Sequence, residues 1–227
     1  MLHGQPGTGK TALGLQLAAE AGCPALYLTA EMAPLELVRR VVARISGQYL
    51  GRFKTGEFTP EQSLAYARAA LTKVPTLAFA DATRAWASPD WLRDHAEAVR
   101  GDNPFLLIVV DSLHSWAEGA DFPRMTEYDI LNAAIASLRQ LAGMLSCSVV
   151  AIAERNRISM SGGGLSAGAG TGKIEYGAET VIDLQCEQDA QFDARGEKPV
   201  SLKVVKNRNG DRGACELSFH GALQRFR

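Results

Sequence analysis

The sequence predicts an α/β fold with a mainly parallel central sheet, helices on both of its faces and an antiparallel extension at the C-terminal end. Two observations support this fold class. Helical and strand-like patterns alternate through the first two thirds of the 227 residues, and such alternation is typical of parallel sheets. From about residue 178 onward, strand-like runs follow one another with glycine-rich turns and no helix between them, which indicates antiparallel pairing.

The expected helices rest on apolar periodicity and on capping residues. Gly22 follows an Ala- and Leu-rich stretch, as glycines often do at the end of a helix. Thr59, Pro60 and Gln62 have the spacing of a capping box with a first-turn proline, and Ser88 precedes a second such proline. Helices are therefore expected over residues 10–21, 35–45, from 60 onward, from 89 to about 100, and across 131–145.

The expected strands are short apolar runs. They cover residues 25–29, 76–80, 105–110 and 148–153, and the extension adds 180–185, 201–206 and 215–219. Only three residues precede the first motif, so we expect a truncated first strand. Six glycines among residues 161–172 predict a loop. The sequence shows neither an internal repeat nor a second core, and we expect a single domain over residues 1–227.

Composition excludes several classes of protein. Hydrophobic residues make up 46% and charged residues 22%, which is ordinary for a soluble globular protein and not for a collagen-like, disordered or disulfide-dense chain. The longest apolar run, residues 105–110, is far shorter than the ~20 residues of a membrane helix. No signal-peptide pattern opens the sequence. The four widely spaced cysteines are expected as free thiols, so we expect a cytoplasmic protein with no membrane partner.

The clearest motif is a phosphate-binding loop. Residues 4–11 match the pattern G-x-x-x-x-G-K-[ST] and lead directly into an apolar helical stretch. Such loops surround a phosphate with backbone N–H groups at the positive end of a helix. Lys10 is expected to contact the β- and γ-phosphates, and Thr11 to ligate a metal ion. We therefore expect ATP and Mg²⁺ as cofactors, with the nucleotide bound by Gly4, Gln5, Pro6, Gly7, Thr8, Gly9, Lys10, Thr11 and Ala12.

Two carboxylates are expected to complete this site. The apolar strand over residues 105–110 ends in Asp111, a Walker B pattern, so Asp111 would bind Mg²⁺ through a water molecule. The next residue is Ser112, where many ATPases of the AAA+ class have their catalytic Glu. We expect Glu31, just beyond the strand 25–29, to act as the base, because it would face the γ-phosphate across the cleft. This arrangement is typical of RecA-like P-loop ATPases.

With these motifs in place, the sequence resembles the motor domain of DnaB-type replicative helicases over nearly its whole length. The matching segments of that family are its Ser-Leu-Glu-Met, Walker B, Leu-Ser-Gln-Leu-Asn-Arg, Ile-Glu-Gln-Asp-Ala-Asp and Lys-x-Arg-Asn-Gly motifs. Their counterparts here, in the same order, are Thr29-Ala30-Glu31-Met32, Val110-Asp111-Ser112-Leu113, Ile152-Ala153-Glu154-Arg155-Asn156-Arg157, Ile174-Glu175-Tyr176-Gly177-Ala178-Glu179 and Lys206-Asn207-Arg208-Asn209-Gly210.

The resemblance implies a role for each segment. Glu31 would be the catalytic base, and Glu154 stands where the family has a Gln that senses the γ-phosphate. Lys206 and Arg208 would act in trans, in the active site of the neighbouring subunit. The family resemblance also implies a homo-oligomer, either a hexameric ring or a filament, and single-stranded DNA as a partner. The residues expected to contact DNA, in and around the glycine-rich loop, are Arg155, Arg157 and Lys173.

Three functions remain open from the sequence. The first is an ATP-driven motor that translocates on single-stranded DNA. The second is a non-translocating RecA-like ATPase, a switch or loader that acts on a protein partner; Glu154 and the weakly basic loop favour it. The third is a phosphotransferase that uses the same phosphate loop. Stimulation of ATP turnover by single-stranded DNA distinguishes the first function from the second.

Overall fold

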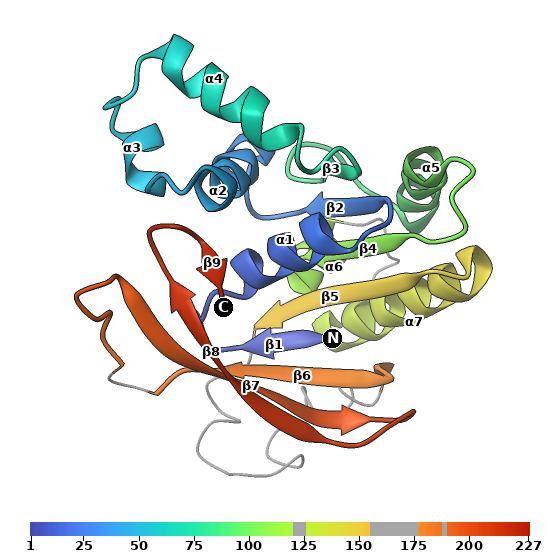
Figure 1. Cartoon of the computed structure of the whole chain (residues 1–227). Coiled ribbons are helices and arrows are strands. Elements are labelled where there is room, and N and C mark those ends of the chain that lie inside the picture. Colours follow the sequence, from blue (N-terminus) through green and yellow to red (C-terminus); the bar gives the residue numbers. More distant parts are fainter. Residues whose placement is uncertain (120–125, 155–176, 188–189) are drawn as a thin grey trace.

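The computed structural model describes residues 1–119, 126–154, 177–187 and 190–227. Within these ranges, nine strands form one sheet in the order β3-β2-β4-β5-β1-β6-β7-β8-β9 (Figure 1). The strands are β1 (Leu2–Gly4), β2 (Ala25–Thr29), β3 (Leu77–Asp81), β4 (Leu107–Asp111), β5 (Ser148–Glu154), β6 (Thr180–Gln185), β7 (Glu197–Asn207), β8 (Gly213–His220) and β9 (Arg225–Phe226).

The predicted division of the sheet is confirmed, with one correction at its boundary. The strands from β3 to β6 pair in parallel, and β7, β8 and β9 continue the sheet antiparallel. We expected residues 180–185 in the antiparallel extension, but β6 runs parallel to β1 and only its other edge, against β7, is antiparallel. A parallel neighbour needs a crossover of a dozen or more residues. The long glycine-rich connection before β6 allows one without a recognisable helical pattern.

Helices cover both faces of the parallel strands. They are α1 (Lys10–Glu20), α2 (Pro34–Ser46), α3 (Leu50–Lys54), α4 (Pro60–Leu71), α5 (Pro89–Arg100), α6 (Leu113–Gly119) and α7 (Glu127–Leu145). Leu26 and Leu28 of β2 share a buried cluster with residues of α5, α6 and α7. Tyr27, between them, belongs to a second cluster with residues of α1 and α2. Successive side chains of a strand point to opposite faces, so β2 is buried on both sides.

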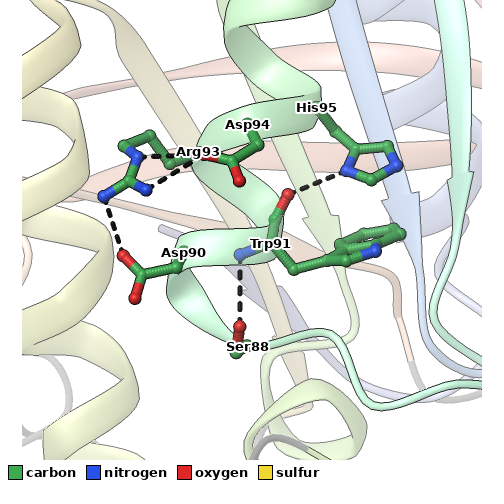
Figure 2. A network of polar contacts seen from close by, with 6 residues as sticks. All are labelled: Ser88, Asp90, Trp91, Arg93, Asp94 and His95. Carbon is green, nitrogen blue, oxygen red and sulfur yellow. Dashed lines mark hydrogen bonds and ion pairs between the residues drawn. The ribbon is translucent and has the colours of Figure 1, made fainter.

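The predicted helix starts are confirmed in detail. Thr59 and Gln62 form the reciprocal capping box of α4, with hydrogen bonds of 3.3 and 2.9 Å. In α5, the Ser88 hydroxyl accepts from the backbone N–H of Trp91 at 3.1 Å. Figure 2 shows this first turn, with Arg93 bonded to Asp90 and Asp94. Local sequence therefore determines where these helices begin.

Some features were not predicted. The short helices α3 and α6 and the two-residue strand β9 are too brief for a periodicity to be recognised. All four cysteines are free thiols, as expected. No helix among the described residues has the length and apolar character needed to span a bilayer. The glycine-rich loop, residues 161–172, lies outside the described residues.

Candidate functional site

A cavity of about 330 Å³ lies beside the phosphate loop, where the carboxyl ends of the parallel strands meet. The register explains the convergence: Gly4 of β1 is opposite Glu154 of β5, and Thr29 of β2 is opposite Asp111 of β4. The predicted site residues that line the cavity are Pro6, Gly7, Gly9, Lys10, Thr11, Ala12, Glu31, Asp111 and Glu154. Gly4, Gln5 and Thr8 belong to the same loop but are not part of the lining.

The loop between β1 and α1 has the geometry expected of a phosphate cradle. Gly7 and Gly9 have φ angles of 78° and 94°, a region that side chains with a Cβ rarely adopt. A Cβ at Gly9 would also lie 2.8 Å from the Phe226 ring of β9. Lys198 of β7 donates to the Gly7 carbonyl at 3.0 Å. The antiparallel extension therefore packs against the loop and holds it at the edge of the cavity.

Lys10 lies folded against the loop that precedes it. Its Nζ donates to the carbonyl oxygens of Gly4 and Gln5, each at 3.0 Å. Burial lowers the pKa of Lys10, and the carboxylates of Glu154, Asp111 and Glu31 act in the opposite direction. An ammonium surrounded by carbonyl oxygens and acids can bind the oxygens of a phosphate when one is present.

Asp111 is buried, with 5% of its surface exposed. Its Oδ2 accepts hydrogen bonds from the Thr11 hydroxyl at 2.8 Å and from the Tyr27 hydroxyl at 2.7 Å. Burial raises the pKa of Asp111, and these two hydrogen bonds oppose that rise. A hydroxyl and a carboxylate in contact form the hard oxygen donor set that Mg²⁺ prefers, so Thr11 and Asp111 fit the expected ion. Sequence reasoning missed Tyr27, because a Tyr in an apolar strand is usually a core residue.

Glu31 lies just beyond β2, exposed, with its carboxylate held by two serines. Its Oε1 accepts from the Ser112 hydroxyl at 2.5 Å and from the Ser115 hydroxyl at 2.9 Å. The two serine hydroxyls are themselves 3.0 Å apart. Both serines lie at the end of β4 and in α6, more than eighty positions away in sequence. No sequence pattern signalled this contact.

Other residues at the cavity were also unforeseen. Arg40 of α2 lines it and donates to the Gln224 side chain, which comes from the turn before β9. Ser112 and Phe219 contribute to the lining as well. The cavity is therefore built from the phosphate loop, the ends of β2, β4 and β5, helix α2, and the C-terminal extension.

The remaining predicted residues lie elsewhere. Lys206 lies near the end of β7 beside Asn207, and Arg208 follows in the turn towards β8; neither lines the cavity. Arg208 is exposed, and its backbone N–H donates to the Glu179 carbonyl at 3.0 Å. The residues expected to contact DNA, Arg155, Arg157 and Lys173, lie outside the described residues. In the described ranges, no three His, Cys, Asp or Glu side chains gather as a metal site.

Comparison with known proteins places this fold and cavity in one family. The family model described as "DnaB-like helicase C terminal domain" matches residues 1–227. A curated relative, the replicative DNA helicase DnaB of Treponema pallidum (strain Nichols), is 28% identical over 240 residues, covering 100% of this chain and 50% of the relative. The chain thus spans about half the length of that relative.

Two solved structures have the same fold, each with a TM-score of 0.82 at 16% identity over 99% of this chain. One is a DnaB-like replicative helicase, described together with its interactions with primase, of which 56% is covered. The other is a separately solved ATPase domain, of which 82% is covered. With a family model that matches from end to end and a phosphate loop seated beside Asp111 and Glu31, the chain belongs to the DnaB-like helicase C-terminal domain family.

Proposed function

We propose that this chain is an ATP-hydrolysing motor domain that binds Mg-ATP between the subunits of a homo-oligomer and translocates on single-stranded DNA. One observation carries the proposal. The phosphate loop, the Walker B carboxylate of Asp111 and the acid Glu31 line the same cavity although they come from three separate parts of the chain. These are the groups that hydrolysis of a nucleoside triphosphate requires.

The phosphate loop and Lys10 bind the triphosphate. Lys10 exchanges its present bonds to the Gly4 and Gln5 carbonyls for bonds to the β- and γ-phosphate oxygens. The start of α1 adds backbone N–H groups on the same side. Bound Mg²⁺, held by Thr11 and through water by Asp111, would neutralise charge on the phosphates.

Glu31 acts as the general base. It accepts a proton from the attacking water as the water oxygen bonds to the γ-phosphorus and the bond from that phosphorus to the β-γ bridging oxygen breaks. The Ser112 and Ser115 hydroxyls bond only Oε1 among the described contacts. They orient the carboxylate, and Oε2 serves the water.

Arg208 and Lys206 complete the site of a neighbouring subunit. They lie at the far end of the β7–β8 pair and line none of the cavity in their own chain. In a hexameric ring or a filament, the same turn would meet the next subunit's γ-phosphate, where a cation stabilises developing charge. Arg155, Arg157 and Lys173 would contact the DNA backbone, with weak selectivity for sequence.

The test is ATP turnover by the purified chain, with and without single-stranded DNA. We expect turnover that DNA stimulates, and none in Lys10→Ala, because the triphosphate loses its main cation. Lys73→Ala removes the same group from an exposed position after α4 and should behave as wild type. Turnover close to wild type in Lys10→Ala would refute the assignment of the phosphate loop.

The alternative is an ATPase switch or loader that acts on a protein partner without translocating. Glu154 favours it, because an acid at the end of β5 faces the region of Lys10, where the helicases carry a Gln. ATP turnover that depends on Lys10 but does not respond to single-stranded DNA would support this alternative over the motor.

A further inference from the structure

Tyr27 contributes a polar group to an otherwise apolar layer. It lies in the middle of β2 with 0% of its surface exposed, in the cluster between the sheet and α1. Tyr27 is opposite Val109 in β4, and Asp111 is two positions further along the same face. Diagonal neighbours of this kind are within reach of an aromatic side chain. The Tyr27 hydroxyl thus meets Asp111 Oδ2 at 2.7 Å from below the cavity.

The packing of α1 brings this contact close to the phosphate loop. Gly14 lies in the middle of α1, where glycine is unfavourable. A Cβ there would lie 2.7 Å from Ile152 Cδ1 and 3.4 Å from the Tyr27 hydroxyl. The glycine therefore permits α1 to lie directly on β2 and β5, so that Thr11, on the first turn of α1, reaches the same Asp111 oxygen.

Two hydroxyl groups from different elements consequently converge on one carboxylate oxygen. Thr11 approaches from the side of the cavity and Tyr27 from the core, and both described hydrogen bonds end on Oδ2. A phenylalanine would fill the same volume. The hydroxyl would be unfavourable in this apolar layer without its bond to Asp111, so its presence is linked to the carboxylate.

We propose that Tyr27 is a positioning residue for the metal site: its hydroxyl fixes the orientation of Asp111, so that Oδ1 is directed at the water shell of the ion. This inference rests on the proposed function, since it assumes that Asp111 serves Mg²⁺. Partners that orient metal-binding carboxylates typically change metal affinity by about 10–100-fold when removed. Asp111 acts through water, so the lower end of that range applies.

The experiment measures binding of a fluorescent, non-hydrolysable ATP analogue at increasing Mg²⁺ and in EDTA. Tyr27→Phe keeps the ring and its contact with Phe79, whose centroid is 6.0 Å away. We expect the Mg²⁺ concentration for half-maximal binding to rise about tenfold, with unchanged binding in EDTA. The matched control is Tyr66→Phe, which removes a hydroxyl from the aromatic cluster beside α3 and should leave both values unchanged.

Each outcome separates this inference from the proposed function. If the wild-type chain fails to bind the analogue with Mg²⁺, the proposed function fails. If the wild type binds and Tyr27→Phe shows the same Mg²⁺ dependence, only the role of Tyr27 is overturned. Equal losses with Mg²⁺ and in EDTA would also overturn it, because the hydroxyl would then support the shape of the cavity rather than the ion.

Discussion

Glu31 and Glu154 both face the region of Lys10, and their surroundings distinguish them. Glu31 has one carboxylate oxygen held by the Ser112 and Ser115 hydroxyls. For Glu154, the described contacts include no side-chain hydrogen bond, although its charge acts on Lys10. A base must be held in one orientation to take a proton from a particular water molecule. The serine contacts therefore favour Glu31 as the base.

Glu31→Gln should leave nucleotide binding intact while the rate of hydrolysis falls by about 10²–10⁴, the usual contribution of a general base. The amide preserves the shape of the side chain but cannot accept the proton of the attacking water. The measurement is steady-state ATP turnover together with the affinity for a fluorescent nucleotide. Glu154→Gln serves as the comparison and should retain turnover. The opposite pattern, an active Glu31→Gln and an inactive Glu154→Gln, would place the base on β5.

At the scale of elements, α3 and α4 form an outer layer that reaches the sheet only through α2 (Figure 1). Phe53, Phe58 and Tyr66 hold this layer together, with ring centroids 5.0 to 5.9 Å apart. Only Ala70 of α4 is buried. A helix with so little burial depends more than others on its local capping interactions.

Thr59→Ala should therefore destabilise α4 by about 1 kcal/mol, the usual effect of losing an N-cap side chain. In amide hydrogen exchange, this corresponds to about a fivefold loss of protection in α4. Thr55→Ala is the matched control, because Thr55 is exposed and its side chain makes no hydrogen bond among the described contacts. Equal protection in Thr59→Ala and wild type would show that the outer packing, and not the cap, stabilises the helix.

At the scale of the whole molecule, the cavity and the Lys206–Arg208 segment belong to different parts of the chain. The segment lies at the end of β7, on the far side of β6 and β1 from the strands that carry Asp111 and Glu31. Arg208 is exposed and lines none of the cavity. This arrangement is what a residue acting on a neighbouring subunit would require.

Arg208→Ala should lower ATP turnover by about 10³–10⁵, the effect of losing an arginine finger. Mixing Arg208→Ala with Lys10→Ala subunits should restore part of the activity, because some interfaces then pair an intact phosphate loop with an intact arginine. The measurement is turnover as a function of the mixing ratio. An absence of recovery at every ratio would rule out the trans role.

The sequence by itself determined the features that depend on neighbouring residues. The glycines and Lys10 of the phosphate loop, the capping residues Thr59 and Ser88, and the buried strands all have fixed local spacings, and the structure has them where the sequence predicted. Such patterns act through backbone conformation and helix capping, which are set within a few residues. Their outcome does not depend on how the rest of the chain is arranged.

Only the tertiary structure decided which distant groups meet. The direction of β6 followed from its pairing with β1, and no local pattern in residues 180–185 distinguishes a parallel from an antiparallel edge. The bonds from Tyr27 to Asp111 and from Ser112 to Glu31 join residues more than eighty positions apart. They exist because the strand order sets β2 beside β4, and that order is chosen by the packing of the whole core.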